Sequence, residues 1–210
     1  MKNYKVLEML EQDRIDELKA ELRDEIFAES LATVPSAKKR YAAMKRYLSY
    51  VDSAREVLKK ASEIELDGVK YTVLCNAYSL ALTKESCGEI EKADETERYP
   101  DVTNLVKYDG SISTLDINRV IAEAKSYGYK LKKAEILKDN YLMHYDGAYF
   151  RIGLLDAAYS VVDDGKEATV YHVNGARRPL TITTDIGVCV VMPVFIDGEP
   201  EEPVVVIEAK

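Results

Sequence analysis

The strongest constraint on the fold is a regular series of turn signals in the last two thirds of the chain. Glycine follows Asp or Asn six times, at Asp67-Gly68, Asp109-Gly110, Asp146-Gly147, Asp164-Gly165, Asn174-Gly175 and Asp197-Gly198. Such pairs favour tight turns between antiparallel strands, because both residues tolerate positive φ. The segments between them show strand and helix patterns without a regular βαβ alternation. The sequence therefore predicts an α+β fold.

The periodicity of apolar side chains predicts the individual elements. Helices are expected over residues 5–30, 36–61, 114–127 and 151–162. Strands are expected over residues 64–66, 69–82, 130–137, 141–145, 168–173, 180–184, 188–196 and 204–207. Ser36 is the expected N-cap of the second helix, and Ser113 or Thr114 that of the third. No internal repeat is convincing at the level of identity.

These elements divide the chain into three parts. Residues 1–62 form a predicted N-terminal helical hairpin, residues 63–196 an α+β domain, and residues 197–210 an acidic tail. The tail contains five acidic residues and one lysine. A chain of 210 residues is long enough for one substantial core with an appendage.

Charge and cysteine content narrow the classes of function. The net charge of −8 argues against non-specific binding of nucleic acid by the surface as a whole. The three cysteines are scattered and odd in number, which favours a reducing, cytoplasmic setting over a disulfide framework. No apolar run approaches the length of a membrane span, so we expect no membrane contact.

Positive charge is concentrated in the second predicted helix. Residues 36–62 contain eight basic and two acidic side chains. The basic pairs fall mainly on the flank and back of the apolar stripe of the helix. Two interpretations stay open, a solvated helix face and a helix that faces phosphate. The residues of this patch that we assign to DNA binding are Lys38, Lys39, Arg40, Lys45 and Arg46.

The sequence contains no established catalytic or metal-binding pattern. Gly-rich phosphate loops and nucleophile elbows are absent, and His144 and His172 have no metal-ligand spacing. Cys189 lies in an apolar strand, where a thiolate is disfavoured. We therefore expect no catalytic residue, no metal and no cofactor. A distant alternative is an enzyme that uses the acidic loop at residues 89–97.

Residues 177–196 are predicted to form a hairpin with an apolar ending. Residues 179–184 alternate apolar and polar side chains, and residues 185–187 form the turn. The following run, residues 188–194, is almost wholly apolar, as in a strand buried on both faces. Pro193 has no N–H group, so it marks the place where ladder hydrogen bonding stops.

Four separate stretches resemble one family, the bacterial sliding clamp, which is the ring-shaped processivity factor of DNA polymerase. They are residues 75–81 (CNAYSLA), 98–102 (RYPDV), 153–158 (GLLDAA) and 190–194 (VVMPV). In chain order they resemble a strand of the partner-binding pocket, the segment leading into the final domain, the start of the last helix and the C-terminal strand. The resemblance covers about residues 68–196.

The resemblance implies a DNA-clamp-like domain of antiparallel sheets with two packed helices, which needs no catalytic residue. Clamp helices present basic side chains to DNA without reading bases, and a surface pocket receives short peptides of replication proteins. The implied pocket is lined by Asn76, Ala77, Tyr78, Ser79, Leu80, Val190, Val191, Met192, Pro193 and Val194. An ordinary core strand is the alternative for the second half of that list. Further residues that could meet phosphate are Arg119, Lys125, Lys130, Lys132 and Lys133, with ordinary solubilising charge as the alternative.

The expected function is that of a sliding-clamp-like accessory protein of DNA replication. Its expected partners are DNA, bound independently of sequence, and a DNA polymerase or another replication protein. One copy has room for little more than one clamp domain, so encircling a duplex requires a homo-oligomer. The alternative is an interaction module, of phage or mobile-element origin in one interpretation, that keeps the clamp fold without the ring. The acidic tail either adds a strand or blocks the pocket.

Overall fold

The computed structural model describes residues 10, 14–15, 18, 22, 35–51, 55–84, 90–94, 96–132, 136, 141–173, 175–198, 200 and 203–207. Three α-helices of more than one turn lie among them: α3 (Pro35–Leu48), α4 (Ile117–Ser126) and α5 (Ile152–Val162). Two short 3-10 helices also occur, η1 (Glu56–Lys59) and η2 (Thr103–Leu105). No helix within these ranges is both long and apolar enough to cross a membrane.

The strands form two sheets. The large sheet is antiparallel throughout and has the order β1-β2-β3-β9-β8-β7-β4. Its strands are β1 (Ser62–Leu66), β2 (Val69–Cys75), β3 (Ser79–Thr83), β4 (Ser111–Leu115), β7 (Ala168–His172), β8 (Leu180–Thr184) and β9 (Gly187–Val191). The small sheet has the order β10-β5-β6, from β5 (Leu142–Tyr145), β6 (Ala148–Arg151) and β10 (Val204–Ile207). The α+β prediction is confirmed.

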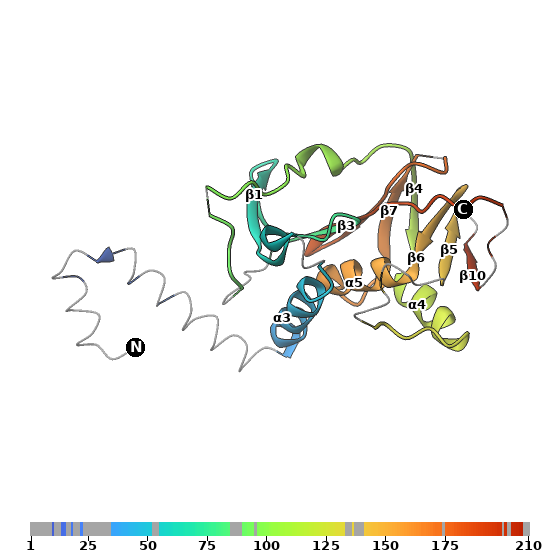
Figure 1. Ribbon diagram of the computed structural model, residues 1–210, viewed down its shortest axis with the longest axis horizontal. Coiled ribbons are helices and arrows are strands. Elements are labelled where there is room, and N and C mark those ends of the chain that lie inside the picture. Colours follow the sequence, from blue (N-terminus) through green and yellow to red (C-terminus); the bar gives the residue numbers. More distant parts are fainter. Residues whose placement is uncertain are drawn as a thin grey trace.

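The large sheet separates two hydrophobic cores. Helices α3, α5 and α4 lie on one side of it, and the segment that carries η2 crosses the other side (Figure 1). Met44, Tyr47 and Leu155 belong to the helix-side core, whereas Leu58 and Val102 belong to the opposite core. Strands β3 and β9 are buried along their whole length because they are covered on both faces.

The two central strands approach unusually closely at Gly187. A Cβ atom added there would lie 2.2 Å from the Leu82 carbonyl oxygen and 2.8 Å from the Val162 side chain. Only glycine fits between the backbone of β3 and the end of α5. Gly187 pairs with Thr83 at the end of the β3–β9 ladder.

The topology contains a repeat that the sequence does not show. Helix α3 is followed by the consecutive antiparallel strands β1, β2 and β3, and α5 is followed by β7, β8 and β9. The last strands of the two units pair antiparallel, with Ala81 opposite Cys189 at the centre. Read from β1 or from β7, the order is the first, second and third strand of one unit and then the third, second and first strand of the other. In the chain, β4, α4, β5 and β6 lie between the two units.

The core crosses both predicted domain divisions. Ala43, Met44 and Tyr47, which precede residue 62, pack in the same cluster as α5, and Val205, which follows residue 196, packs there too. The predicted strand at residues 204–207 is confirmed as β10, which pairs parallel to β5. Of the two interpretations of the tail, its described residues 203–207 follow the one that adds a strand.

The helical hairpin at the N-terminus was predicted with boundaries that the structure corrects. The second helix ends at Leu48 rather than at residue 61, and η1 follows separately. The break lets Val51 and Leu58 reach the core on the opposite face of the sheet, which a continuous helix could not do. Of the first predicted helix, Leu10, Ile15, Leu18 and Leu22 are helical and Arg14 is not, and the remaining residues lie outside the described ranges.

Four other predicted elements have different boundaries. The strand at residues 69–82 is two strands, because Asn76 reverses the chain. The third helix begins at Ile117, capped by Asp116 instead of Ser113 or Thr114, since residues 111–115 extend into β4 against β7. Residues 130–132 form no strand, and residues 133–135 and 137–140 lie outside the described ranges. The last strand of the hairpin ends at Val191, and Val194 makes only an isolated bridge to Tyr149.

Candidate functional site: an apolar groove at Met192

The two stretches predicted to form one pocket lie side by side. Strands β3 and β9 pair directly, with Ser79 opposite Val191 and Leu80 opposite Val190. Beyond the ladder, the Met192 N–H donates to the Tyr78 carbonyl at 2.9 Å. Residues separated by more than half of the chain are thus brought together.

Only part of the predicted pocket reaches the surface. Asn76, Ser79, Leu80, Val190 and Val191 are buried in the sheet. Tyr78 is 46% exposed, and Ala77 is exposed beside it. The remaining predicted residues, Met192, Pro193 and Val194, are half-buried. The buried members are therefore core residues of the sheet, and of the ten only Met192 lines the groove described next.

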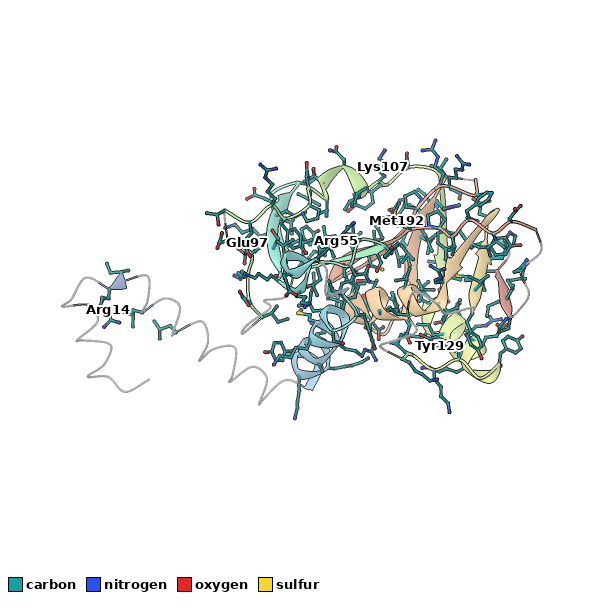
Figure 2. The ribbon with its side chains drawn as sticks, viewed as in Figure 1. Arg14, Arg55, Glu97, Lys107, Tyr129 and Met192 are labelled. Atoms are coloured by element: carbon teal, nitrogen blue, oxygen red, sulfur yellow. The ribbon has the colours of Figure 1, made fainter. Side chains whose placement is uncertain are left out.

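A groove of about 190 Å³ lies next to Met192. Its lining is mainly apolar, and it joins the ends of β7, β8 and β9 to the segment around η2. The lining residues are Asn104, Leu105, Lys107, Asp109, Tyr171, Val173, Arg178, Pro179, Thr181 and Met192. Lys107 lies on the segment that crosses over the sheet, and Met192 lies beneath that segment (Figure 2).

Sequence reasoning found one lining residue, Met192, and missed the others. The segment after Tyr99-Pro100-Asp101-Val102 supplies Leu105 and Lys107, and that stretch was already among those that resemble a clamp. The residues that directly follow this stretch were therefore the sequence signal for Leu105 and Lys107. Nothing local in the sequence indicates that Tyr171 or Pro179 would meet it.

The segment that forms the roof of the groove is anchored at both ends. Tyr99 donates its hydroxyl to the Val73 carbonyl at 3.4 Å, and burial raises its pKa above the ordinary value. Val102 is 1% exposed in the core below. Farther along, the Tyr108 ring meets the Tyr171 ring edge-on at 5.3 Å. Hydrogen bonds from Thr103 lower the pKa of Asp101, which closes the turn between these anchors.

The back wall is held by a buried histidine. His172 is 1% exposed, and both of its ring nitrogens face acceptors. Nδ1 lies 3.2 Å from Oδ2 of Asp146, and Nε2 lies 3.2 Å from the Arg178 carbonyl. The backbone of Gly110 packs so closely on His172 that a Cβ would lie 2.1 Å from its carbonyl oxygen. His172 therefore links the β5–β6 turn to the backbone of Arg178, a lining residue of the groove.

A polar network supports the β2–β3 turn from the helix side. The Tyr47 hydroxyl donates to the Ser79 carbonyl at 2.7 Å. Oδ1 of Asn76 accepts from the backbone N–H groups of Tyr78 and Ser79, at 3.1 and 2.7 Å. Ala77 adopts a positive φ of 72° within this turn. The amide Nδ2 of Asn76 is buried without a hydrogen-bond partner in the described part of the chain.

The basic residues of α3 are largely engaged within the protein. Lys39 Nζ lies 3.0 Å from Asp163, and Arg46 lies 3.9 Å from Asp156. Lys45 lies over the Tyr41 ring, 4.5 Å from its centroid. Lys38 and Arg40 complete the predicted set on this helix; Lys38 is exposed and Arg40 is half-buried.

The other predicted DNA-facing residues lie on the same side of the sheet. Arg119 and Lys125 are exposed on α4, and Lys130 and Lys132 are exposed in the segment after it. Helices α3 and α4 flank α5 on this side (Figure 1). Lys133 lies outside the described residues. The structure thus places the predicted basic residues of α3 and those of α4 and the segment after it on the same side of the sheet, with α5 between the two sets.

A second cavity, of about 320 Å³, lies between β4, α4 and the small sheet. Its lining combines carboxylates, hydroxyls and aliphatic side chains: Ser113, Thr114, Leu115, Asp116, Arg119, Val120, Glu123, Tyr145, Glu167, Val206 and Ile207. The Ser113 and Tyr145 hydroxyls bond each other, and Asp116 caps α4 by accepting from the Arg119 N–H at 2.9 Å. These polar groups have structural partners.

The described residues of the acidic loop also have structural partners. Lys60 lies 2.7 Å from Glu91 and 2.8 Å from Glu97. Asp94 accepts from the backbone N–H groups of Thr96 and Glu97, which closes a tight turn. No group of three or more His, Cys, Asp or Glu side chains is placed to hold a metal ion within the described ranges.

Both described cysteines are buried. Burial raises the pKa of the Cys75 thiol and, more strongly, that of Cys189, so both are protonated near neutral pH. Cys87 lies outside the described residues. Cys189 is a core residue at the centre of the β3–β9 pair, as the sequence predicts.

Comparison with known proteins does not assign the chain to a family. No protein-family model matches the chain, and neither a curated protein nor a solved structure matches it. The likeness to sliding clamps is a resemblance of four short stretches.

Proposed function

We propose that this chain is a clamp-like, non-enzymatic accessory protein of DNA replication that binds a short apolar peptide of a replication protein at the Met192 groove. One observation carries the proposal. Two stretches chosen for their resemblance to the clamp pocket lie next to each other, and Met192 of the second stretch lines a groove with a mainly apolar surface. The third stretch, residues 98–102, leads into the roof of the same groove.

The energetics of such a site favour a peptide anchor. Leu105, Met192 and Pro179 offer apolar surface, which stabilises a bound side chain by about 25 cal/mol per Å² removed from water. A volume of about 190 Å³ is below that of typical small-molecule pockets, roughly 300–1,000 Å³. The groove suits one or two apolar side chains of a peptide that continues across the surface.

Peptide titration by calorimetry tests the proposal. A neutral peptide with a central pair of leucines should bind the full chain. Met192→Ala and Leu105→Ala should each weaken binding about tenfold, the loss of ~1.4 kcal/mol that is typical of an anchor contact. Val69→Ala, on β2 outside the groove, should leave affinity unchanged. No binding, or binding that neither groove substitution affects, would contradict the proposal.

Sliding on DNA is the second candidate, and the placement of Lys38, Lys125 and Lys130 on the helix side of the sheet favours it. Phosphate would have to compete with Asp163 for Lys39 and with Asp156 for Arg46. Binding to DNA should then fall steeply with salt and weaken on charge reversal at Lys45 and Arg46. A strict monomer in sedimentation at high concentration, with no retention on circular DNA, would eliminate this candidate.

A further inference from the structure

We infer that the Met192 groove selects peptides that carry a carboxylate beside the apolar anchor. The inference rests on the proposed function, because it specifies the chemistry of the peptide that the groove receives. The evidence for it is the set of charged side chains that line the groove. The resemblance to clamps implies nothing about these side chains.

Two cations at the groove are uncommitted. Lys107 and Arg178 both line it and are exposed, and neither has an ion-pair partner among the described residues. Elsewhere in the described chain, lysines such as Lys39, Lys60 and Lys166 pair with carboxylates at 3.0 Å or less. In a protein with a net charge of −8, two unpaired cations on one small groove are available to an incoming anion.

The groove also contains one carboxylate, Asp109. Its charge offsets one of the two cations, so the net charge of the lining is +1. This positive charge is local, and its sign is opposite to that of the net charge of the whole protein. Selection for an acidic ligand must therefore come from short-range pairing, because the long-range field of the protein repels anions.

The two cations come from separate segments of the lining whose backbones are held by contacts. The Arg178 N–H donates to the Gly175 carbonyl at 3.1 Å, and its own carbonyl faces Nε2 of His172 at 3.2 Å. Lys107 belongs to the roof segment that Val102 and Tyr108 anchor. A guanidinium can bind a carboxylate through two parallel N–H donors, which adds geometric selectivity to charge.

Apolar anchor and carboxylate are expected to lie close together in the bound peptide. Leu105 and Lys107 are two residues apart on the roof, and Arg178 directly precedes Pro179 on the wall. An aliphatic side chain seated between Leu105 and Pro179 would therefore place its sequence neighbours beside Lys107 or Arg178. The occupant to which we commit is a partner peptide with Asp or Glu within one or two residues of a Leu or similar anchor.

The experiment uses the full chain and three fluorescent peptides that share the central leucine pair. One carries Asp and Glu on both sides of the pair, one Asn and Gln, and one Lys and Arg. At low salt the acidic peptide should bind about fivefold more tightly than the neutral one, since an exposed pair contributes roughly 0.2–1 kcal/mol and two are available. The preference should shrink as salt is raised to about 1 M, where the screening length is only about 3 Å.

Four variants identify the residues responsible for the preference. Lys107→Gln and Arg178→Gln should each reduce the ratio of acidic to neutral affinity, and together they should bring it to about one. Asp109→Asn should raise the ratio. Lys70→Gln, an exposed lysine on β2 outside the groove, should leave the ratio unchanged.

The outcomes separate the inference from the proposed function. Equal affinity for acidic and neutral peptides, tighter binding of the basic peptide, or a ratio that survives the double substitution would overturn the inference alone if Met192→Ala still weakens binding about tenfold. Failure of all three peptides to bind overturns both. A ratio that follows the three charge substitutions in the expected directions supports the inference.

Discussion

At the scale of single residues, buried hydroxyl and amide groups decide the shape of the turn behind the groove. The backbone around Asn76 and Ala77 reverses direction because Oδ1 of Asn76 replaces a backbone carbonyl as acceptor. Tyr47, which is fully buried on α3, donates its hydroxyl to the Ser79 carbonyl at the end of the same turn. A helix side chain therefore holds the β2–β3 connection, and through it the Tyr78 carbonyl that binds Met192.

Tyr47→Phe should lower the free energy of unfolding by about 1–2 kcal/mol, because it removes one hydroxyl that is hydrogen-bonded in the interior. Urea unfolding followed by circular dichroism measures the change. Tyr127→Phe is the matched control, since Tyr127 is 52% exposed and should change stability by less than about 0.5 kcal/mol. Equal effects of the two substitutions would show that the Tyr47 hydrogen bond contributes nothing.

The same substitution should change the response to alkaline pH. Burial raises the pKa of Tyr47 well above its ordinary value of about 10. Above about pH 10 the unfolded chain loses this phenol proton while the folded chain keeps it, so stability falls as pH rises. Tyr47→Phe lacks that contribution, and its loss of stability between about pH 9 and pH 11 should be shallower. A steeper loss in the variant would contradict this assignment.

At the scale of elements, the C-terminal strand is part of the fold and not only an acidic extension. Strand β10 pairs parallel to β5, and the Leu142 N–H donates to the Pro203 carbonyl at 3.1 Å where the pairing begins. Val205 points into the core and is 1% exposed, whereas Val206 is 63% exposed. The alternation matches a strand with one buried face.

Val205→Ala should destabilise the protein by about 2 kcal/mol, from two lost carbons and the cavity they leave. Val206→Ala removes the same atoms from an exposed position and should cost less than about 0.5 kcal/mol. Thermal or urea unfolding of both variants tests the pairing of β10. If the two substitutions have the same small effect, the tail is not packed as described.

At the scale of the whole molecule, two helix–three-strand units share one sheet through the β3–β9 pair. Because Leu82 on β3 pairs with Val188 on β9 and both lie in one core cluster, neither unit can lose its central strand without exposing the other. We therefore expect the described core to unfold as one cooperative unit.

Hydrogen exchange of Leu82→Ala tests this cooperativity. The substitution should cost about 2–5 kcal/mol, and it should reduce protection in β8 of the second unit as much as in β2 of the first. Val69→Ala, at a partly exposed position, should reduce neither. Loss of protection confined to β1–β3, with β7–β9 unchanged, would show that the two units unfold independently.

The sequence by itself determined the α+β class, the position of α5, and the strands β7, β8 and β10. These elements are set by local periodicity and turn residues, such as the alternation in Leu180–Thr184 and the Asp164-Gly165 turn. It also indicated that β9 is buried on both faces, because Val188–Val191 offers no polar side to solvent. Where neighbouring patterns merged, at Asn76 and at Asp116, the boundaries were wrong.

Only the tertiary structure decided which strands are neighbours, and with that the repeat and the groove. Periodicity reports the environment of a side chain but not the identity of the element that provides it, so nothing local joins Leu105 to Pro179 or Met192. The same holds for the charges at the groove, because Lys107 and Arg178 line one groove only after the roof segment crosses the sheet. The resemblance of residues 75–81 and 190–194 to the clamp pocket predicts that these two stretches lie together, and they pair as β3 and β9. Packing on both faces of the sheet determined which of their side chains remain on the surface.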